Sequence, residues 1–233
     1  MVIPSYNQRE RATRSANEAH AYLRAHVDPV AEIVVVDDGS APGQVPVAAE
    51  LPADAVLLRN PQNLGKGGAV RAGMLAATGR FVVFTDSDLP FTLEPIADTV
   101  AMLEGGADVV IGDRLLEESE AEADVTLLRR LSSAVFTFMV RQCVGIDFRD
   151  TQCGYKGYRA AVVRPLFEPL EVTSFAFDVE VLVRAIRSGY TVRRQPIRLV
   201  NNEDTSVRLS RHAPQMVADM LRIAWRARRG HYG

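Results

Sequence analysis

The stretch Phe81-Val82-Val83-Phe84-Thr85-Asp86-Ser87-Asp88 indicates how the rest of the chain folds. Its apolar run has the length and composition of a buried β-strand. Asp86 and Asp88 then stand at the carboxyl end of that strand, and this edge of an open α/β sheet is where ligands bind. Two carboxylates one residue apart suit Mg²⁺ or Mn²⁺ carrying a diphosphate. The alternative is a turn that simply closes the strand, because Asp and Ser are common turn residues.

Strand and helix patterns alternate on both sides of this stretch. β-Branched and apolar runs predict further strands at 1–4, 32–36, 55–58, 108–112 and 190–196. Segment 149–156 has an alternation suited to an edge or mixed strand. Helices are predicted at 9–24, 69–77, 93–103, 126–143, 160–167 and 214–229, with a weakly helical segment at 45–51. Segment 175–180 leads into a further predicted helix that reaches residue 187. This order predicts an α/β fold with a mostly parallel central sheet flanked by helices.

The composition is that of an ordinary globular chain. Its 233 residues are 47% apolar and 24% charged, which is enough to bury a normal core. A net charge of −2 gives no general attraction to nucleic acid, so we expect no such partner. The two cysteines, Cys143 and Cys153, lack CxxC spacing and predict neither a disulfide framework nor a zinc site.

No secretory signal and no apolar run of about 20 residues stand out in the sequence, so we expect a cytoplasmic protein. The first predicted strand begins abruptly at Met1, and we therefore expect the native chain to start earlier.

Two further segments bring polar groups to the same predicted edge of the sheet. Strand 32–36 ends in Asp37-Asp38-Gly39-Ser40, a second acidic pair, and the first strand is followed by Ser5-Tyr6-Asn7. The Gly-rich segment 60–69 runs into a helix, and its glycines, together with Lys66, would let backbone N–H groups approach an anion. The P-loop spacing is absent, and tight packing of helix against strand is the alternative explanation for these glycines.

Taken in this order, Pro4-Ser5-Tyr6-Asn7 and Val36-Asp37-Asp38-Gly39-Ser40 resemble the inverting glycosyltransferase family 2, which has the GT-A fold. Segments 63–71, 84–89, 150–156 and 175–180 look like those of its dolichyl- and polyprenyl-phosphate β-glucosyltransferases. The resemblance covers nearly the whole chain. It implies a single GT-A (Rossmann-like) domain over residues 1–233, with a small mixed extra sheet. Residues 1–113 would form the nucleotide-sugar-binding half, and residues 114–233 the acceptor-binding half with an amphipathic C-terminal helix.

The resemblance implies a metal-dependent hexosyltransferase. It would transfer glucose, with inversion, from a UDP-sugar to a polyprenyl or dolichyl phosphate, with Mg²⁺ or Mn²⁺ as cofactor. Three alternatives keep the same fold: a GDP-mannose donor, a hydroxyl acceptor, or a nucleotide-sugar-binding protein without turnover. A nucleotidyltransferase is disfavoured, because its Gly-rich loop should directly follow the first strand, where Ser5-Tyr6-Asn7-Gln8 stands.

The resemblance also implies roles for individual residues. Asp86 and Asp88 would hold the metal ion, and Asp38, ahead of Asp37, would be the acid near the ribose or base. The donor-binding set is Pro4, Tyr6, Asn7, Asp37, Asp38, Gly65, Lys66, Asp86 and Ser87. The acceptor-binding set is Arg114, Arg129, Arg130, Ser133, Gln152 and Lys156. The catalytic set is Asp88, Arg114, Arg129 and Asp178.

Acceptor chemistry can be argued from the residue types. A phosphate is already anionic at neutral pH, so it needs positioning by forked guanidinium groups rather than a base. The arginines of the acceptor-binding set supply them, although an Arg pair on a helix is commonly a solvated face. A hydroxyl acceptor would need a carboxylate to take its proton, and Asp178 and Asp150 are the candidates. Alternatively, Asp178 is a carboxylate at the N-terminus of a helix that interacts favourably with the helix dipole, and Glu180 forms a cap or an ion pair within its helix.

Two departures from the resembled enzymes affect these expectations. Pro90 stands where the related mannose synthases carry a Gln, so a third side-chain ligand is missing there. We therefore expect the metal ion to be weakly held and to depend on the donor diphosphate for further ligands. The eukaryotic glucosyltransferases carry a membrane segment, and none is visible here. Arginines gather after Arg208, and on an anionic membrane each would contribute about 1 kcal/mol. We therefore expect at most a peripheral contact at the inner face of the cytoplasmic membrane.

Overall fold

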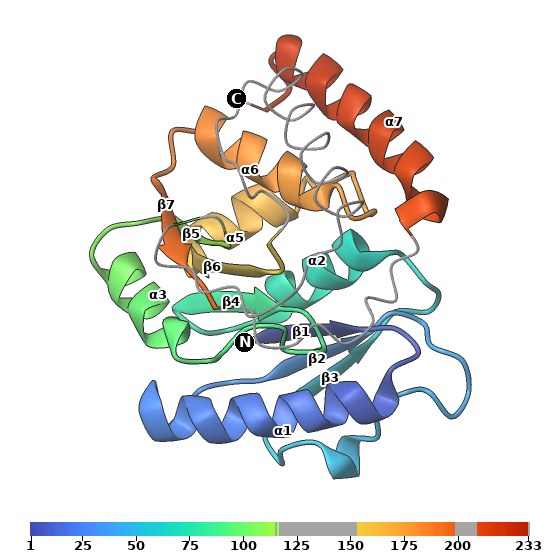
Figure 1. Ribbon diagram of the computed structural model, residues 1–233, viewed down its shortest axis with the longest axis vertical. Coiled ribbons are helices and arrows are strands. Elements are labelled where there is room, and N and C mark those ends of the chain that lie inside the picture. Colours follow the sequence, from blue (N-terminus) through green and yellow to red (C-terminus); the bar gives the residue numbers. More distant parts are fainter. Residues whose placement is uncertain (115, 117–152, 199–208, 233) are drawn as a thin grey trace.

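The computed structural model describes residues 1–114, 116, 153–198 and 209–232, and these form one mixed sheet covered by helices on both faces (Figure 1). The strands are β1 (Val2–Ser5), β2 (Val34–Asp37), β3 (Val56–Arg59), β4 (Phe81–Thr85), β5 (Val109–Asp113), β6 (Tyr155–Arg159) and β7 (Val192–Pro196). The helices are α1 (Arg9–His26), the 3₁₀ turn η1 (Ala48–Glu50), α2 (Lys66–Ala76), α3 (Pro95–Glu104), α5 (Ala160–Phe167), α6 (Phe177–Arg187) and α7 (Leu209–Arg228).

The described strands form a single seven-stranded sheet in the order β3-β2-β1-β4-β6-β5-β7. Parallel pairing joins β3, β2, β1 and β4, and also joins β5 to β7, as the alternation of strands and helices predicts. β6 runs antiparallel between β4 and β5, so the mixed pairing expected from this part of the chain lies inside the main sheet. The order changes direction between β1 and β4. This is the switch point at which open α/β sheets bind ligands.

β1 and β4 are paired only near the start of β1, at Val2 and Phe84. The backbone carbonyls of Met1 and Ser5 accept hydrogen bonds from β2. The backbone N–H and C=O groups of the even-numbered residues of β1 therefore point toward β4. Pro4 is one of these, and it has no N–H with which to continue the ladder. Among the described residues, the carboxyl end of β1 is therefore not paired with β4. This end lies at the edge of the sheet where a ligand is predicted to bind.

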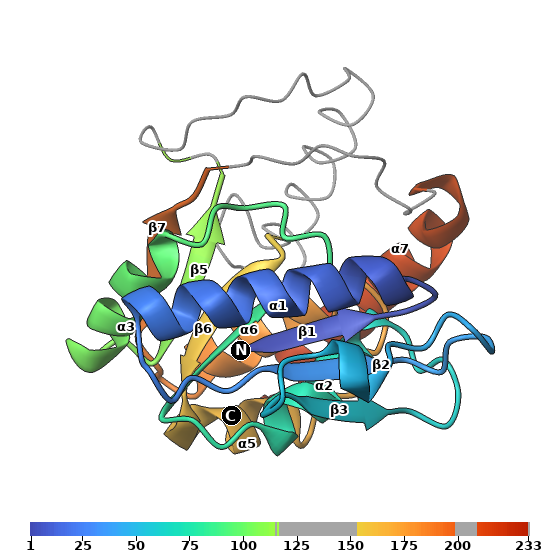
Figure 2. The same ribbon diagram turned by 90° about the horizontal axis from the view of Figure 1, so that it is seen from below.

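Alternate residues of the central strands face two separate apolar clusters. In β2, Val34 and Val36 pack into the cluster shared with α2, α5, α6 and α7, whereas Val35 packs into the cluster shared with α1. α1 and α3 accordingly cover one face of the sheet, and α2, α5 and α6 cover the other (Figure 2). α7 packs on the outer side of α6 (Figure 1). Because α6 lies between the sheet and α7, even its Asp178 and Glu180 are buried.

Helix starts differ from the predictions at glycine and proline positions. α2 begins at Lys66 rather than at 69, because Gly67 fits against Phe177, whose Cβ would lie 2.6 Å from a Cβ added at Gly67. α7 begins at Leu209 rather than at 214 and accommodates Pro214, which forgoes one helical N–H. The predicted helix at 126–143 lies outside the described residues. Among the residues that the structure describes, no helix has the length and apolar character needed to cross a membrane.

Candidate active site

The segments that follow β1 and β2 are tied together by Asn7. Its backbone N–H donates to Ser40 Oγ over 2.7 Å, and its Oδ1 accepts from the N–H of Ala41 over 2.9 Å. Asn7 has a φ of 53°, a left-handed conformation that Asn tolerates better than most residues. Tyr6 beside it is 47% exposed. Asn7 therefore shapes the loop, and Tyr6 presents its ring at the edge of the sheet.

Asp38 binds the Gly-rich turn with both of its carboxylate oxygens. Oδ1 accepts from Asn60 Nδ2 over 2.7 Å and from the N–H of Leu64 over 3.0 Å. Oδ2 accepts from the N–H of Gly65 over 2.9 Å. Two N–H groups that the turn would have offered to an anion are thereby used. Both oxygens of Asp38 thus bind the protein, and the role expected for Asp38 near the ribose or base stays a prediction.

Asp37, the second choice for that role, keeps one carboxylate oxygen without a partner. Its side chain is fully buried, and Oδ2 accepts from the N–H of Ser40 and lies 3.3 Å from Arg59 Nε. Oδ1 is buried and has no hydrogen-bond partner among the described residues. A buried oxygen left without a partner carries a desolvation cost, which a ligand hydroxyl or N–H would relieve. Asp37 is therefore the better placed of the two acids for binding the donor.

Glycines of the turn pack against the segment that precedes α6. Gly65 has a φ of +87°, and a Cβ added to it would lie 2.5 Å from the carbonyl oxygen of Thr173. The N–H of Gly67 donates to the same oxygen over 2.8 Å. The tight-packing explanation for the glycines is thus confirmed at these two positions. The turn is held from both sides, by Asp38 and by Thr173.

Lys66 reaches from the start of α2 to the acidic triplet. Its Nζ lies 2.7 Å from Asp86 Oδ1 and 5.8 Å from the centre of the Phe175 ring. Burial acts to lower the pKa of Lys66, but the surrounding carboxylates, Asp86 foremost, raise the pKa by more. On the other side of Asp86, a Cβ added at Gly154 would lie 2.1 Å from Oδ2. The carboxylate of Asp86 is thus confined between an ammonium group and a glycine backbone.

Asp88 carries the features expected of a cation ligand. Its Oδ1 is buried and has no hydrogen-bond partner among the described residues. Burial and then the charge of Asp86 raise the pKa of the Asp88 carboxyl. Leu89 follows with a φ of 41°, a strained conformation of the kind that clusters at functional sites. A divalent ion would satisfy the orphaned oxygen and offset the repulsion between the two carboxylates, so these residues fit the expected Mg²⁺ or Mn²⁺.

Ser87, between Asp86 and Asp88, attaches the acidic triplet to α1 and to Gln8, the residue that precedes α1. Its Oγ donates to Gln8 Oε1 over 2.5 Å, and its carbonyl accepts from Ser15 Oγ over 2.8 Å. Both contacts are to the protein, so Ser87 positions the carboxylates on either side of it. The described residues contain no cluster of three or more His, Cys, Asp or Glu side chains arranged for a metal.

Lys156 and Asp178 form an ion pair in the core below the site. Lys156 is 0% and Asp178 is 2% exposed, and Nζ lies 2.7 Å from Asp178 Oδ1. The ammonium also donates to the carbonyl of Cys153 over 2.6 Å and lies 5.5 Å from the Phe84 ring centre. Burial raises the pKa of Asp178, and the positive charge of Lys156 opposes that shift. The structure therefore places Lys156 inside the protein rather than along the acceptor or the sugar.

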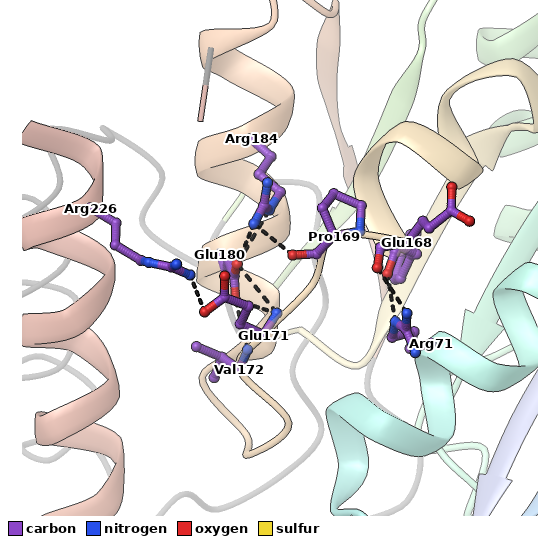
Figure 3. Close-up of polar contacts among 9 residues, drawn as sticks. Arg71, Glu168, Pro169, Glu171, Val172, Glu180, Arg184 and Arg226 are labelled. Atoms are coloured by element: carbon purple, nitrogen blue, oxygen red, sulfur yellow. Dashed lines mark hydrogen bonds and ion pairs between the residues drawn. The ribbon is translucent and has the colours of Figure 1, made fainter. Parts of the chain in front are cut away.

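Glu180 holds the segment that carries Thr173 (Figure 3). Its carboxylate accepts from the N–H of Glu171 over 3.2 Å and from the N–H of Val172 over 2.8 Å. The guanidinium of Arg184, one turn later on α6, donates to Glu180 Oε1 over 2.8 Å. The ion pair expected for Glu180 within its helix is thus confirmed. The hydrogen bonds that Glu180 accepts from Glu171 and Val172 were not predicted, because no local sequence pattern indicates them.

Two other helices attach to the same segment (Figure 3). Arg226 of α7 forms an ion pair with Glu171. Arg71 of α2 donates to the carbonyls of Phe167 and Glu168 over 2.9 and 2.8 Å. Residues 167–173 are therefore held by α2, α6 and α7 together.

Most of the predicted acceptor residues cannot be placed. Arg129, Arg130, Ser133 and Gln152 lie outside the described residues. Arg114 is partly buried in the turn directly after β5, at the same edge of the sheet as the segments that follow the parallel strands β4 and β7. Gly154 had no assigned role in the sequence, and no signal in its neighbourhood points to its close approach to Asp86.

Comparison with known proteins identifies relatives of this chain. Residues 1–167 match the family model for glycosyl transferase family 2. The chain is 28% identical to a dolichyl-phosphate beta-glucosyltransferase of Saccharomyces cerevisiae, over 96% of this chain and 73% of that protein. It is 30% identical to a dolichyl-phosphate beta-glucosyltransferase of Trichomonas vaginalis, over 96% and 72%. It is 35% identical to the enzyme of that name in Drosophila melanogaster, over 79% and 61%.

Solved structures share the fold at lower identity. Mannosyl-3-phosphoglycerate synthase from Rubrobacter xylanophilus superposes with a TM-score of 0.67 at 20% identity, covering 99% of this chain and 73% of that one. Glucosyl-3-phosphoglycerate synthase from Mycobacterium tuberculosis, crystallised with uridine diphosphate, superposes with a TM-score of 0.64 at 18% identity, covering 96% and 78%. Both neighbours are GT-A glycosyltransferases, so the likeness shows that architecture for the sheet and its helices.

Proposed function

The chain belongs to glycosyl transferase family 2 and has the GT-A fold, and from this premise we propose that it transfers glucose from UDP-glucose to a polyprenyl phosphate with inversion. The curated relatives that carry the name dolichyl-phosphate beta-glucosyltransferase support this acceptor and this sugar. Because a polyprenyl phosphate is held in a membrane, the reaction takes place at a membrane surface.

One observation carries the proposal. Asp37, the last residue of β2, and Asp88, in the turn after β4, each keep a buried carboxylate oxygen that has no hydrogen-bond partner among the described residues. Both stand at the carboxyl edge of the sheet, on either side of the β1–β4 switch point. A nucleotide-sugar offers ribose or base donors to the one and a metal-bound diphosphate to the other. Tyr6, exposed between them at the end of β1, adds an aromatic face against which a base can stack.

Asp86 and Asp88 would hold Mg²⁺ or Mn²⁺, which when bound neutralises charge that develops on the departing diphosphate. Glucosyl-3-phosphoglycerate synthase from Mycobacterium tuberculosis, a structural neighbour, was crystallised with Mn²⁺ and UDP. Lys66 adds a fixed positive charge, because its Nζ lies 2.7 Å from Asp86 Oδ1. Asp38 and Thr173 position Lys66 indirectly, since they hold the turn from which it extends.

Transfer requires no proton to be removed from the acceptor. An anionic phosphate oxygen forms a bond to C1 of the glucose, from the face opposite the diphosphate. The bond from C1 to the UDP oxygen breaks, and its electron pair leaves with UDP, through an oxocarbenium-like state. Arg114 would position the acceptor phosphate, together with Arg129, Arg130 and Ser133. The burial of Asp178 and its pairing with Lys156 support a role in balancing charge below the site rather than as a base.

A transfer assay tests this proposal. Purified protein is supplied with labelled UDP-glucose, a short polyprenyl phosphate in detergent and Mn²⁺, and the lipid product is extracted. We expect a β-linked glucosyl phosphate, with the anomeric configuration assigned by NMR. Asp88→Asn should abolish transfer, whereas Asp98→Asn, on an exposed acid of α3, should not change it. Product from GDP-mannose alone would reassign the donor, and labelled sugar on a hydroxyl acceptor would reassign the acceptor. Donor binding without any product would leave a nucleotide-sugar-binding protein.

A further inference from the structure

α7 turns a stripe of large apolar side chains toward solvent. Val217, Leu221 and Trp225 are 41%, 60% and 50% exposed, and their spacing of four residues places them along one side of the helix. The opposite side of α7 buries Met220 and Ile223 in the cluster shared with α6. We call the stripe formed by Val217, Leu221 and Trp225 the α7 ridge. It is not needed for packing, because α7 already has a buried face.

Positive charge flanks the α7 ridge. Arg222, Arg228 and Arg229 are exposed on the outer part of the same segment. The guanidinium of Arg229 lies 4.2 Å from the centre of the Trp225 ring. The sequence from 214 to 230 contains one acid, Asp219, and its buried carboxylate accepts from Ser174 Oγ over 2.6 Å on the inner side of the helix. The outer face therefore combines apolar side chains with arginines and shows no carboxylate.

We propose that the α7 ridge docks the protein on the surface of an anionic membrane. Leu221 and Trp225 enter the interface between headgroups and acyl chains, and the three flanking arginines lie against lipid phosphates. Apolar side chains with Trp on one side and Arg beside them are the composition of helices that lie in a membrane interface. The inference rests on the proposed function, since a polyprenyl phosphate acceptor brings the enzyme to a membrane.

The inner face of α7 connects the ridge to the candidate active site. Asp219 bonds Ser174 and Arg226 pairs with Glu171, so α7 holds both ends of the short segment that contains Thr173. Thr173 in turn contacts the turn from which Lys66 extends. In Figure 2, α7 lies at the end of the molecule toward which β1, β2 and β3 point. Docking through the ridge therefore brings the catalytic edge of the sheet to the lipid surface.

Trp225 is the only tryptophan of the chain and reports directly on its own environment. The probe is a set of vesicles of phosphatidylcholine, alone or mixed with phosphatidylglycerol. With the anionic vesicles, we expect a blue shift of the tryptophan emission and quenching by lipids brominated near the headgroup. The shift should weaken as salt is raised, because screening reduces the attraction of the arginines to the surface.

Co-sedimentation with the same vesicles separates the two contributions. Leu221→Ser with Trp225→Ser should reduce the partition coefficient at least tenfold. Changing Arg222, Arg228 and Arg229 to Gln should reduce it about fivefold for each arginine, the equivalent of about 1 kcal/mol each. The matched controls are Val30→Ser, at an apolar residue 76% exposed, and Arg80→Gln, at the amino end of β4. Both controls should bind as the unaltered protein does, and all variants should keep its melting temperature, because the altered side chains are exposed.

Three results would overturn the inference. The first is absence of binding to anionic vesicles at low salt, and the second is undiminished binding by the ridge variants. The third is a ridge already covered without lipid, shown by self-association or co-purification of a partner that the ridge variants abolish. The proposed function is judged separately, by transfer to a short acceptor in detergent. Ridge variants should retain that transfer and lose transfer to an acceptor embedded in vesicles.

Discussion

Asp37 and Asp38 are adjacent in the chain, yet their carboxylates serve different purposes. Successive side chains at the end of a strand project to opposite sides. Asp38 is thereby directed to Asn60, Leu64 and Gly65 of the Gly-rich turn. One buried carboxylate oxygen of Asp37 has no hydrogen-bond partner among the residues that the structure describes. The two adjacent acids thus differ in their contacts: Asp38 binds the Gly-rich turn, and Asp37 is the one that we propose binds the donor.

This division predicts opposite results for substitutions of the two acids. Asp38→Ala should lower the free energy of unfolding by about 2–3 kcal/mol, because it leaves the N–H groups of the turn without their acceptor. Asp37→Asn should keep the stability but weaken UDP binding about tenfold or more, the range for a hydrogen bond to a charged group. Urea unfolding and isothermal titration with UDP and Mn²⁺ measure the two effects. Equal loss of UDP affinity without destabilisation in both variants would contradict the division.

Gly154 is the residue whose missing side chain leaves room for Asp86. A Cβ at this position would lie 2.1 Å from Asp86 Oδ2, so Gly154→Ala must displace the carboxylate. We expect metal-dependent UDP binding to weaken at least tenfold while the protein stays folded, as judged by circular dichroism. Gly79→Ala is the matched control, because the added Cβ meets only the Phe81 carbonyl oxygen at 3.2 Å. Unchanged UDP affinity in Gly154→Ala would show that Asp86 is not needed where it stands.

At the scale of elements, the segment before α6 connects α6 and α7 to the Gly-rich turn at the start of α2. Glu180 of α6 binds the N–H groups of Glu171 and Val172, and Arg226 of α7 pairs with Glu171. The carbonyl of Thr173 then supports Gly67 at the start of α2. The Gly-rich turn therefore depends on residues more than a hundred positions away in the sequence.

Glu180→Gln should loosen this segment and, through it, the Gly-rich turn. The amide replaces a charge-assisted acceptor of two N–H groups and of Arg184, so we expect a loss of about 2 kcal/mol in stability and several-fold weaker UDP binding. Hydrogen exchange should accelerate both at 171–173 and at 64–67. The control is Glu168→Gln, since the carboxylate of Glu168 forms an exposed pair with Arg164 and the substitution leaves its backbone carbonyl, which binds Arg71, in place. Faster exchange confined to 171–173 would refute the coupling.

The end of the described chain packs back on α6 and makes stability sensitive to alkaline pH. Tyr232 is buried beside Arg184, whose guanidinium lies 4.6 Å from the ring centre. Burial, and then the charge of Glu180, raise the pKa of Tyr232 to about 12. In the unfolded chain this phenol ionises near its ordinary pKa of 10.0, so the contribution of Tyr232 is complete below that pH and is lost as pH rises toward 12.

Comparison of Tyr232→Phe with the unaltered protein isolates this contribution. Other buried tyrosines titrate in both proteins, so the informative quantity is the difference in unfolding free energy. We expect that difference to stay constant at neutral pH and to move in favour of Tyr232→Phe above about pH 10. Urea unfolding across this range measures it, with Tyr6→Phe, at an exposed tyrosine, as control. A difference independent of pH would mean that Tyr232 is not buried in solution.

At the scale of the whole molecule, donor binding should join the two sides of the switch point through the metal. With UDP at about 100 times its dissociation constant and Mn²⁺ present, ligand binding adds about 2.7 kcal/mol. For a protein of this size the melting temperature should then rise by about 5–10 °C. A chelator should remove the rise and leave the melting temperature of the ligand-free protein unchanged. The same rise in the presence of chelator would exclude metal-dependent donor binding.

Much of this architecture follows from local patterns. The alternation of apolar strands and helices predicts the parallel pairing of β1, β2, β3 and β4, because strand and helix periods are properties of short segments. Carboxylates that end two buried runs must meet at one edge, since parallel strands share their carboxyl ends. The sequence alone therefore determined the fold class and the acidic character of the sheet edge at which the candidate site lies.

Only the tertiary structure decided what each polar group does there. The confinement of Asp86 by Gly154, the burial of Lys156 and the unpartnered oxygen of Asp37 all depend on contacts between distant segments. The inward turn of Asp219, which leaves the α7 ridge without a carboxylate, depends in the same way on Ser174. Periodicity states which residues share a face, whereas packing determines which atoms on that face keep a partner and which are left for a ligand.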